Sequence, residues 1–146
     1  MSKSDKAAEM MGAGYNCAQA VSTTYGTAYG VPEEAIARMA TAFGGGIGRT
    51  DNICGAVSGA IMVLGLRFGA GSPDETDAKT RTSIMAAEFI KEFTRRYGAA
   101  SCTGLLGYNM SVPGEAAKAS AAKAFTGCRD IVRNAGNLLE EFLQRE

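Results

Sequence analysis

The chain has 146 residues, of which 46% are hydrophobic, so it is long enough to bury the core of one domain spanning 1–146. Fifteen basic side chains balance fifteen acidic ones, which argues against a dedicated nucleic-acid-binding protein. The zero net charge also favours self-association, for example as a homodimer. The first residues lack the apolar stretch of a signal peptide, and no apolar run is long enough to cross a bilayer, so we expect a cytoplasmic protein without membrane insertion.

The spacing of apolar residues is helical almost throughout and predicts an all-α, single-domain bundle of five to seven helices around a glycine-rich central helix. A first helical region is expected over about 4–29, with a break near Gly12 and Gly14. Pro32 should open the next helix. The apolar face of that helix would comprise Ile36, Met39, Ala40 and Phe43.

A glycine cluster over residues 44–48 predicts a tight turn with positive φ angles between two helices. Its spacing resembles a dinucleotide-binding loop, but no strand precedes it, so nucleotide binding is not indicated. We expect the turn to lie beside Cys54 and to leave room for a small ligand or a partner thiol. The candidate residues for binding such a ligand or cofactor are Gly45, Gly46, Gly48 and Arg49.

The helix that follows the glycine cluster is apolar on nearly all sides, so it should be the central and most buried one. Thr50 or Asp51 is expected to cap it, and it would run to about Phe68. Gly55 and Gly59 lie four residues apart on one of its faces. Small residues at this spacing would let another backbone approach closely.

The second half of the chain is expected to form one long helix and several shorter ones. Ser72 and Glu75 predict a capping box at the start of the long helix, which should end at Gly98. Its buried stripe would comprise Met85, Phe89, Phe93 and Tyr97. A short turn or helix is expected over 101–106, and a last helical region should begin at Gly114. That region ends in an amphipathic stretch with Ile131, Ala135, Leu138 and Phe142 on one line.

Four widely spaced cysteines are the chemically distinctive residues of the chain: Cys17, Cys54, Cys102 and Cys128. There is no histidine, which removes the commonest general base and metal ligand. Cys17 and Cys102 follow expected helix caps, and Cys54 would be the third residue after an Asp51 cap. The free N–H groups at a helix start favour a thiolate. Arg49 would add to this effect at Cys54, whereas Asp51 would oppose it.

No two cysteines have C-x-x-C spacing, so neither a zinc ribbon nor a thioredoxin-like site is indicated. Cysteines far apart in sequence can nevertheless converge in a helical bundle and hold an iron–sulfur cluster or another thiolate-bound metal. They can equally be small buried residues of a helical core. The residues alone leave these alternatives open.

Several motifs together carry a resemblance to a known family. Cys17 lies in Gly-Tyr-Asn-Cys-Ala-Gln-Ala-Val, and Gly-Gly-Gly-Ile-Gly-Arg precedes Cys-Gly-Ala-Val-Ser-Gly, which begins at Cys54; single cysteines follow at 102 and 128. In motif, order and length the chain resembles the C_GCAxxG_C_C family of redox-active proteins. The resemblance implies a redox role for all four cysteines and hints at a functional link to a transporter.

Three functions are compatible with these observations. The leading hypothesis is a cytoplasmic thiol oxidoreductase that needs no cofactor, in which Cys54 is the reactive thiolate and Cys17, Cys102 or Cys128 resolves it as a disulfide. Its substrate would be a redox partner or a small-molecule ligand that the sequence does not identify. The second hypothesis is a carrier that binds a metal or an iron–sulfur cluster through the four cysteines. The third is a non-catalytic helical interaction module.

Overall fold

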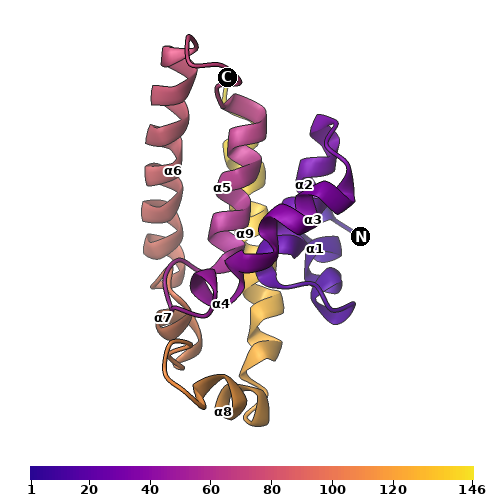
Figure 1. Cartoon of the computed structure of the whole chain (residues 1–146), viewed down its shortest axis with the longest axis vertical. Helices are drawn as coiled ribbons and strands as arrows, with labels where there is room; N and C mark the ends of the chain where they lie inside the picture. Colours follow the sequence, from indigo (N-terminus) through magenta and orange to yellow (C-terminus); the bar gives the residue numbers. More distant parts are fainter.

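Helices make up nearly all the regular structure in the computed structural model, which describes residues 1–146 (Figure 1). The α segments are α1 Lys3–Gly12, α2 Cys17–Gly26, α3 Glu33–Ala40, α4 Gly44–Ile47, α5 Gly55–Phe68, α6 Thr76–Tyr97, α7 Cys102–Leu106, α8 Glu115–Ala121 and α9 Gly127–Leu143. Short 3-10 turns are η1 Thr27–Tyr29, η2 Thr41–Phe43 and η3 Ala124–Thr126. The all-α prediction is confirmed. Even without the irregular α4, however, the helix count exceeds the predicted five to seven.

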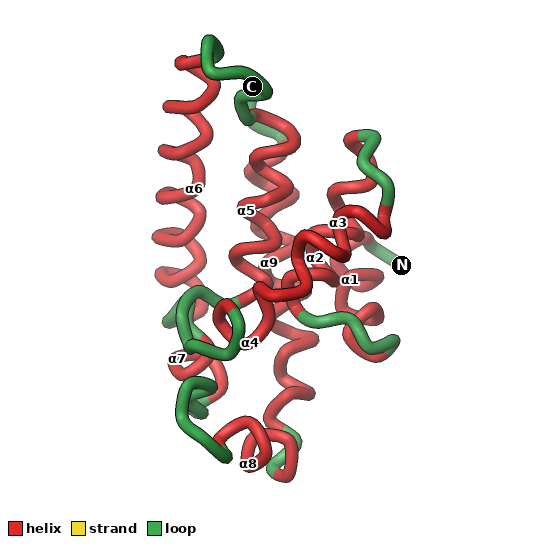
Figure 2. Tube along the Cα trace, in the orientation of Figure 1, coloured by secondary structure: helices red, strands yellow, loops and turns green.

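Helix α5 lies at the centre, as its uniformly apolar sequence predicts. It packs against α2 on one side and against α6 and α9 on the others (Figure 2). The core includes Val57 and Leu64 of α5, Phe89 and Phe93 of α6, and Leu138 of α9, all fully buried. The predicted stripes on α6 and α9 therefore face the core, although Ile131 and Tyr97 are only half-buried. No helix combines the length and the apolar character needed to cross a membrane.

The contact between α2 and α5 is unusually close because glycines of α5 face Ala18 of α2. A Cβ atom added at Gly59 would lie 2.7 Å from the carbonyl oxygen of Ala18. One added at Gly55 would lie 2.9 Å from the Ala18 nitrogen. Real Cβ atoms do not approach backbone this closely, so both positions require glycine while the helices stay where they are. The predicted role of the glycine pair is confirmed.

The helix starts near the N-terminus agree with the sequence patterns. The first region breaks as expected, with Gly14 at a φ of 105°, and Asn16 then caps α2. The side chain of Asn16 accepts a hydrogen bond from the backbone of Gln19, whose own side chain accepts one from Asn16. This capping box fixes Cys17 as the first residue of α2.

Three local predictions are wrong. Met39 does not belong to the buried face of α3 and is 66% exposed, whereas Ile36 is buried. The long helix α6 begins at Thr76, because the Ser72 hydroxyl accepts a hydrogen bond from Asp74 in a local turn and does not cap the helix. Neither Thr50 nor Asp51 caps α5, whose N-cap is Cys54.

The starts of α5 and α9 lie at the same end of the bundle. In Figure 1 the segments α4, α7 and α8 gather at this end, while the C-terminus lies at the other. A small separate apolar cluster, with Cys102, Met110 and Ala119 at its centre, packs α7 against α8 there. This end of the molecule brings the cysteines together.

Candidate functional site: four cysteines at helix starts

Each of the four cysteines lies at the start of a helix. Cys17 and Cys102 are the first residues of α2 and α7, and Cys128 is the second residue of α9. Cys54 is the N-cap of α5 and not its third residue, which corrects the sequence-based position. None of the four is in a disulfide; Cys54, Cys102 and Cys128 are buried, whereas Cys17 is half-buried.

Thiol hydrogen bonds link the four cysteines in a row, in the order Cys128, Cys17, Cys54 and Cys102. The outer two, Cys128 and Cys102, also interact electrostatically. The link between Cys54 and Cys102 depends on a short backbone pairing, in which Ile53 and Ser101 form an isolated antiparallel bridge. The Cys54 N–H also donates a hydrogen bond of 2.6 Å to the Ala100 carbonyl. Residues distant in the sequence thus become neighbours in one sulfur chain.

The proton affinity of the thiols alternates along this row. Hydrogen bonds to Cys128 and Cys54, together with burial, raise the pKa of Cys17 well above its ordinary value. A hydrogen bond to Cys54 likewise raises the pKa of Cys102, with further contributions from burial and from nearby Asp51. The hydrogen bond from Cys17 lowers the pKa of Cys128. Each thiolate-favouring sulfur therefore lies next to a sulfur that keeps its proton.

Cys54 has the clearest environment for a thiolate. Hydrogen bonds from Cys102 and Cys17 lower its pKa well below the ordinary range, and the backbone N–H groups of Ala56 and Val57 lower it further. These N–H groups belong to the first turn of α5, where that of Val57 also donates a hydrogen bond of 2.9 Å to the Cys54 carbonyl. The helix start therefore acts as the sequence suggests, although Arg49 and Asp51 are not among the main causes.

The Cys-Gly-Ala-x-x-Gly motif now has a structural explanation. Cys54 supplies the sulfur, and Gly55 and Gly59 accept the backbone of Ala18 against α5. Because Ala18 follows Cys17 directly, this close helix contact also places the Cys17 sulfur beside that of Cys54. The glycines thus serve the geometry of the cysteines as well as the packing.

A cavity of about 840 Å³ opens onto this cluster. Cys17, Cys102 and Cys128 line it, whereas Cys54 lies outside the lining, 4% exposed. The remaining lining residues are Met11, Asn16, Thr41, Ala42, Gly44, Gly45, Gly48, Arg49, Leu106, Met110, Ala116, Ala117, Ser120 and Phe125. A ligand in the cavity would reach three of the sulfurs directly and Cys54 only through them.

The glycine turn forms part of the cavity wall. Of the four residues predicted to bind a ligand, Gly45, Gly48 and Arg49 line the cavity, whereas Gly46 does not. Gly46 is buried against the chain that follows, where an added Cβ would lie 2.6 Å from the Asn52 nitrogen. The expected positive φ angles are present at all three glycines, so the predicted tight turn is confirmed.

The turn also contains strained residues that the sequence does not indicate. Ile47, Arg49 and Asp51 have φ angles of 67°, 61° and 60°, a region that costs a non-glycine residue about 1–2 kcal/mol. Backbone hydrogen bonds between residues several positions apart hold this conformation. One of them, 2.7 Å long, joins the Gly48 N–H to the Ala42 carbonyl. Such strain often accompanies functional sites, because only a surrounding structure can maintain it.

Asp51 has a role that sequence reasoning missed. Its carboxylate accepts hydrogen bonds from the Thr103 backbone at 3.0 Å and from the Thr103 hydroxyl at 2.5 Å. It also accepts a longer one from the Met110 backbone at 3.4 Å. Asp51 therefore ties the segment carrying Cys102 to the glycine turn. The separation of these partners by more than fifty residues explains why no local pattern marks the contact.

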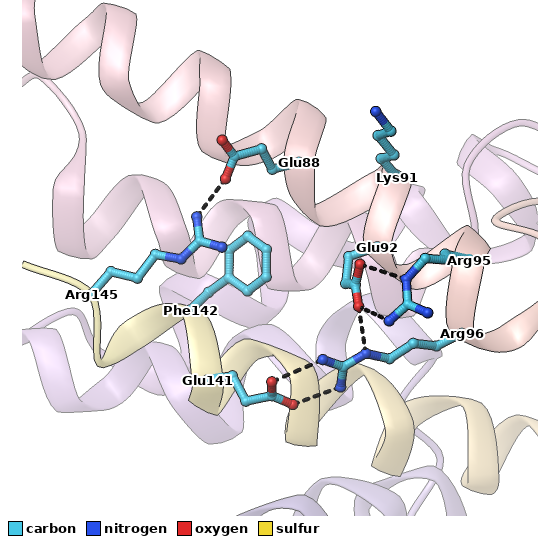
Figure 3. Close-up of a pocket in the computed structure, with 8 residues that line it drawn as sticks. All are labelled: Glu88, Lys91, Glu92, Arg95, Arg96, Glu141, Phe142 and Arg145. Atoms are coloured by element: carbon cyan, nitrogen blue, oxygen red, sulfur yellow. Dashed lines mark hydrogen bonds and ion pairs between the residues drawn. The ribbon is translucent and has the colours of Figure 1, made fainter.

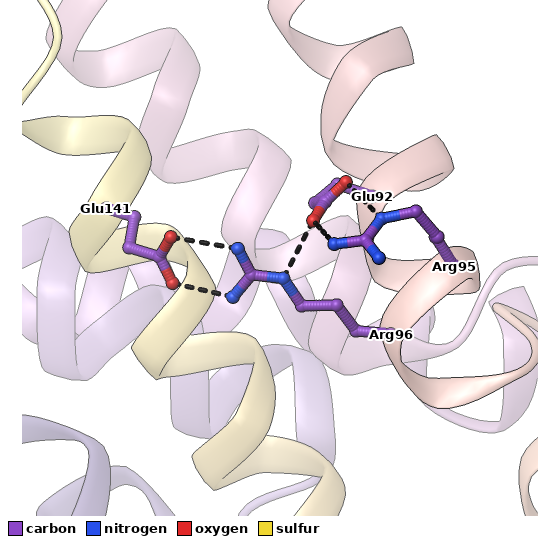
Figure 4. Close-up of polar contacts among 4 residues, drawn as sticks. All are labelled: Glu92, Arg95, Arg96 and Glu141. Atoms are coloured by element: carbon purple, nitrogen blue, oxygen red, sulfur yellow. Dashed lines mark hydrogen bonds and ion pairs between the residues drawn. The ribbon is translucent and has the colours of Figure 1, made fainter.

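The charges and ligand-type side chains elsewhere do not form a comparable site. No group of three or more histidine, cysteine, aspartate or glutamate side chains is arranged to hold a metal ion. A groove of about 460 Å³ between α6 and α9 is lined by charged residues (Figure 3). In it Arg96 pairs with Glu92 and Glu141, and Glu92 also pairs with Arg95 (Figure 4). These groups satisfy one another, so the groove is an ion-pair network that joins two helices.

Comparison with known proteins agrees with the cysteine pattern. A family model described as "Putative redox-active protein (C_GCAxxG_C_C)" matches residues 15–142, a range that contains all four cysteines and the cavity-lining glycine turn. No curated protein and no solved structure matches the chain. Because the family model covers most of the chain, this protein belongs to the C_GCAxxG_C_C family of redox-active proteins.

Proposed function

We propose that this protein is a thiol–disulfide oxidoreductase whose four cysteines form a two-step disulfide relay. The observation that supports it most is the row of four free thiols at a cavity that three of them line. Along this row, sulfurs that favour the thiolate alternate with sulfurs that retain the proton. Disulfide exchange needs such pairs, because one thiolate attacks and a neighbouring thiol resolves the mixed disulfide.

The first step would occur at the cavity. The Cys128 thiolate attacks one sulfur of a substrate disulfide, the substrate S–S bond breaks, and one substrate thiolate leaves. The departing thiolate takes the proton of Cys17, and the Cys17 thiolate then attacks the Cys128 sulfur. The Cys17–Cys128 disulfide forms and the second substrate thiolate leaves. The substrate gains two electrons, and the two protein sulfurs lose them.

The second step would move the disulfide inward. The Cys54 thiolate attacks the Cys17 sulfur, which frees Cys128 and forms a Cys17–Cys54 disulfide. Cys102 loses its proton to the solvent of the cavity that it lines and attacks Cys54, so that the disulfide ends as Cys54–Cys102, and Cys17 leaves as a thiolate that takes up a proton there. No electrons are gained or lost in this transfer. The cavity pair can then react again, so that the four thiols can give up four electrons in all and end as two disulfides.

Mapping of disulfides after limited oxidation tests this function. The reduced protein is treated with a small disulfide, quenched with an alkylating reagent, and analysed by peptide mass spectrometry. We expect three pairings, Cys17–Cys128, Cys17–Cys54 and Cys54–Cys102, because these are the pairs that share a thiol hydrogen bond. Four thiols that stay reduced, or that react no faster than a free small thiol, would contradict the proposal.

Binding of a metal or a cluster through the four cysteines has less support. A structural metal site needs its ligands around one point, and no three or more cysteine or carboxylate side chains are arranged in that way. We therefore do not propose it as a second function.

A further inference from the structure

The cavity contains one charged side chain among seventeen lining residues, and that residue is Arg49. The others are apolar, neutral polar or cysteine, and no lysine, aspartate or glutamate lies among them. A single cation in a wall whose only other charge would be the Cys128 thiolate favours a ligand that carries a negative charge. The volume of about 840 Å³ fits a small molecule, because such sites usually measure about 300–1,000 Å³.

Arg49 is free to bind a ligand. Five other arginines form ion pairs with carboxylates, and Arg67 and Arg81 stack on Phe68. Arg49 and Arg129 have no acidic partner, and of these two only Arg49 lines the cavity. Arg49 is also not what lowers the pKa of Cys128, because that shift comes from the hydrogen bond between Cys128 and Cys17.

The backbone directs Arg49 toward the cavity at an energetic cost. Its φ of 61° belongs to the left-handed region, and its side chain folds back across the turn. A Cβ atom added at Gly45 would lie only 2.8 Å from the Arg49 Cγ, so the side chain covers this glycine. Both residues line the cavity. The strained turn therefore places a guanidinium at the wall that the cysteines share.

We infer that the cavity binds a small disulfide bearing a carboxylate, and that Arg49 recognises this carboxylate while the disulfide reaches Cys128. The inference rests on the proposed function, since it names the substrate class of the same cysteines. A guanidinium binds a carboxylate by two parallel hydrogen bonds, which fixes the orientation of the ligand as well as attracting it. It also offsets the repulsion between an anionic substrate and the Cys128 thiolate. Arg49 is thus a specificity residue that takes no part in bond breaking.

Three symmetrical disulfides that differ in end-group charge test the inference: dithiodipropionate with two carboxylates, dithiodiethanol without charge, and cystamine with two ammonium groups. The rate of protein disulfide formation with each probe is divided by the rate of the same probe with a neutral small thiol. We expect the normalised rate for dithiodipropionate to exceed that for dithiodiethanol by about tenfold, the usual size of a charge-assisted hydrogen bond. Cystamine should be the slowest of the three.

Two variants assign this preference to Arg49. Arg49→Asn removes the charge and suits the backbone, because asparagine tolerates positive φ. It should lose the roughly tenfold preference for the dicarboxylate over dithiodiethanol. Arg49→Gly removes the charge and the strain together, so it provides a folded variant with the same expected loss. Arg38→Gln is the matched control, because Arg38 lies on α3 and pairs with Glu34 outside the cavity.

The outcomes separate the inference from the function on which it rests. Protein disulfides that form equally fast with all three probes, fastest with cystamine, or with an unchanged carboxylate preference in Arg49→Asn would overturn the role of Arg49 and leave the oxidoreductase intact. If none of the probes produces a protein disulfide, the proposed function itself fails.

Discussion

In the groove between α6 and α9, Arg96 lies between Glu92 and Glu141, whereas Arg49 in the cysteine cavity has no acidic partner. The groove lies about 20 Å along α9 from Cys128, at a rise of about 1.5 Å per residue. Its charges satisfy one another and join two helices. The cavity instead combines an unpaired cation, strained backbone and contacting thiols. The groove, whose polar groups are already paired, contributes to structure. The cavity, whose charged and thiol groups remain available, is suited to binding and chemistry.

Removing a sulfur that lines the cavity should have the largest effect on its reactivity. Cys128→Ser replaces the attacking thiolate with a hydroxyl that stays protonated, so disulfide formation with a small disulfide should slow by on the order of 10³-fold or more. Cys17→Ser should instead accumulate a mixed disulfide at Cys128, because the resolving thiol is missing. Intact-mass measurement over time distinguishes the two results. Cys102→Ser is the control and should still form Cys17–Cys128; a Cys128→Ser variant of normal rate would refute the assignment.

The close contact of α2 with α5 should connect stability to the cysteine geometry. Gly59→Ala inserts a methyl group against the Ala18 backbone and should lower the free energy of unfolding by about 1–3 kcal/mol. Because Ala18 follows Cys17, disulfide formation should slow as well. Gly65→Ala in the same helix has nothing within 4 Å and should raise stability by up to about 1 kcal/mol. Denaturant unfolding of both variants measures the difference, and equal effects would contradict the packing argument.

The sequence predicted features that depend on neighbours in the chain. Asn16 before Cys17 indicated a helix start, and the apolar surface of α5 indicated its central position. The spacing of Gly55 and Gly59 indicated a close helix contact, because only the absence of side chains needs to be recognised. All of these features follow from residues close together in the sequence. Three of the four cysteine positions could be predicted in this way, because they lie next to recognisable helix starts.

The features that the sequence did not predict depend on distant partners. Asp51 has the chemistry of a helix cap, but its carboxylate binds Thr103, so the cap position passes to Cys54. Ile47 and Arg49 have no intrinsic preference for positive φ, and only the hydrogen bonds around the turn hold them there. The order of the sulfur contacts likewise follows from the packing of four helices and from no spacing along the chain.

The lowered pKa of Cys54 should be visible in a thiolate titration. Because the folded pKa lies below the unfolded one, Cys54 stabilises the fold fully above the unfolded pKa of about 8.5, and this contribution is lost as pH falls through the folded value. The native protein should therefore show thiolate ultraviolet absorbance at neutral pH that is reduced in Cys54→Ser to the contribution of Cys128. Ser58→Ala is a neighbouring control that leaves the sulfurs in place. If Cys54→Ser keeps the full absorbance, the thiolate belongs to another cysteine.

The smallest expected effect concerns the paired groove. Hydrogen bonds from Arg95 and Arg96 lower the pKa of Glu92 to about 2, so its contribution to stability is present above the unfolded pKa of about 4.3 and is lost as pH falls towards 2. Glu92→Gln should therefore be slightly less stable than the wild type at neutral pH and equally stable in strong acid. The loss should be small and should shrink in salt, because these groups are exposed.

The Glu92→Gln variant also tests whether the groove and the cysteine cavity are independent of each other. Denaturant unfolding at neutral and acid pH gives the stability difference, and Glu34→Gln, which breaks a single exposed pair with Arg38, serves as the reference. Disulfide formation by Glu92→Gln should match the wild type, since no group of the groove touches the cavity. A slower reaction in Glu92→Gln would mean that the ion pairs between α6 and α9 also position the start of α9. In that case the paired charges of the groove would contribute to the chemistry of Cys128. The division between a purely structural groove and a reactive cavity would then be wrong.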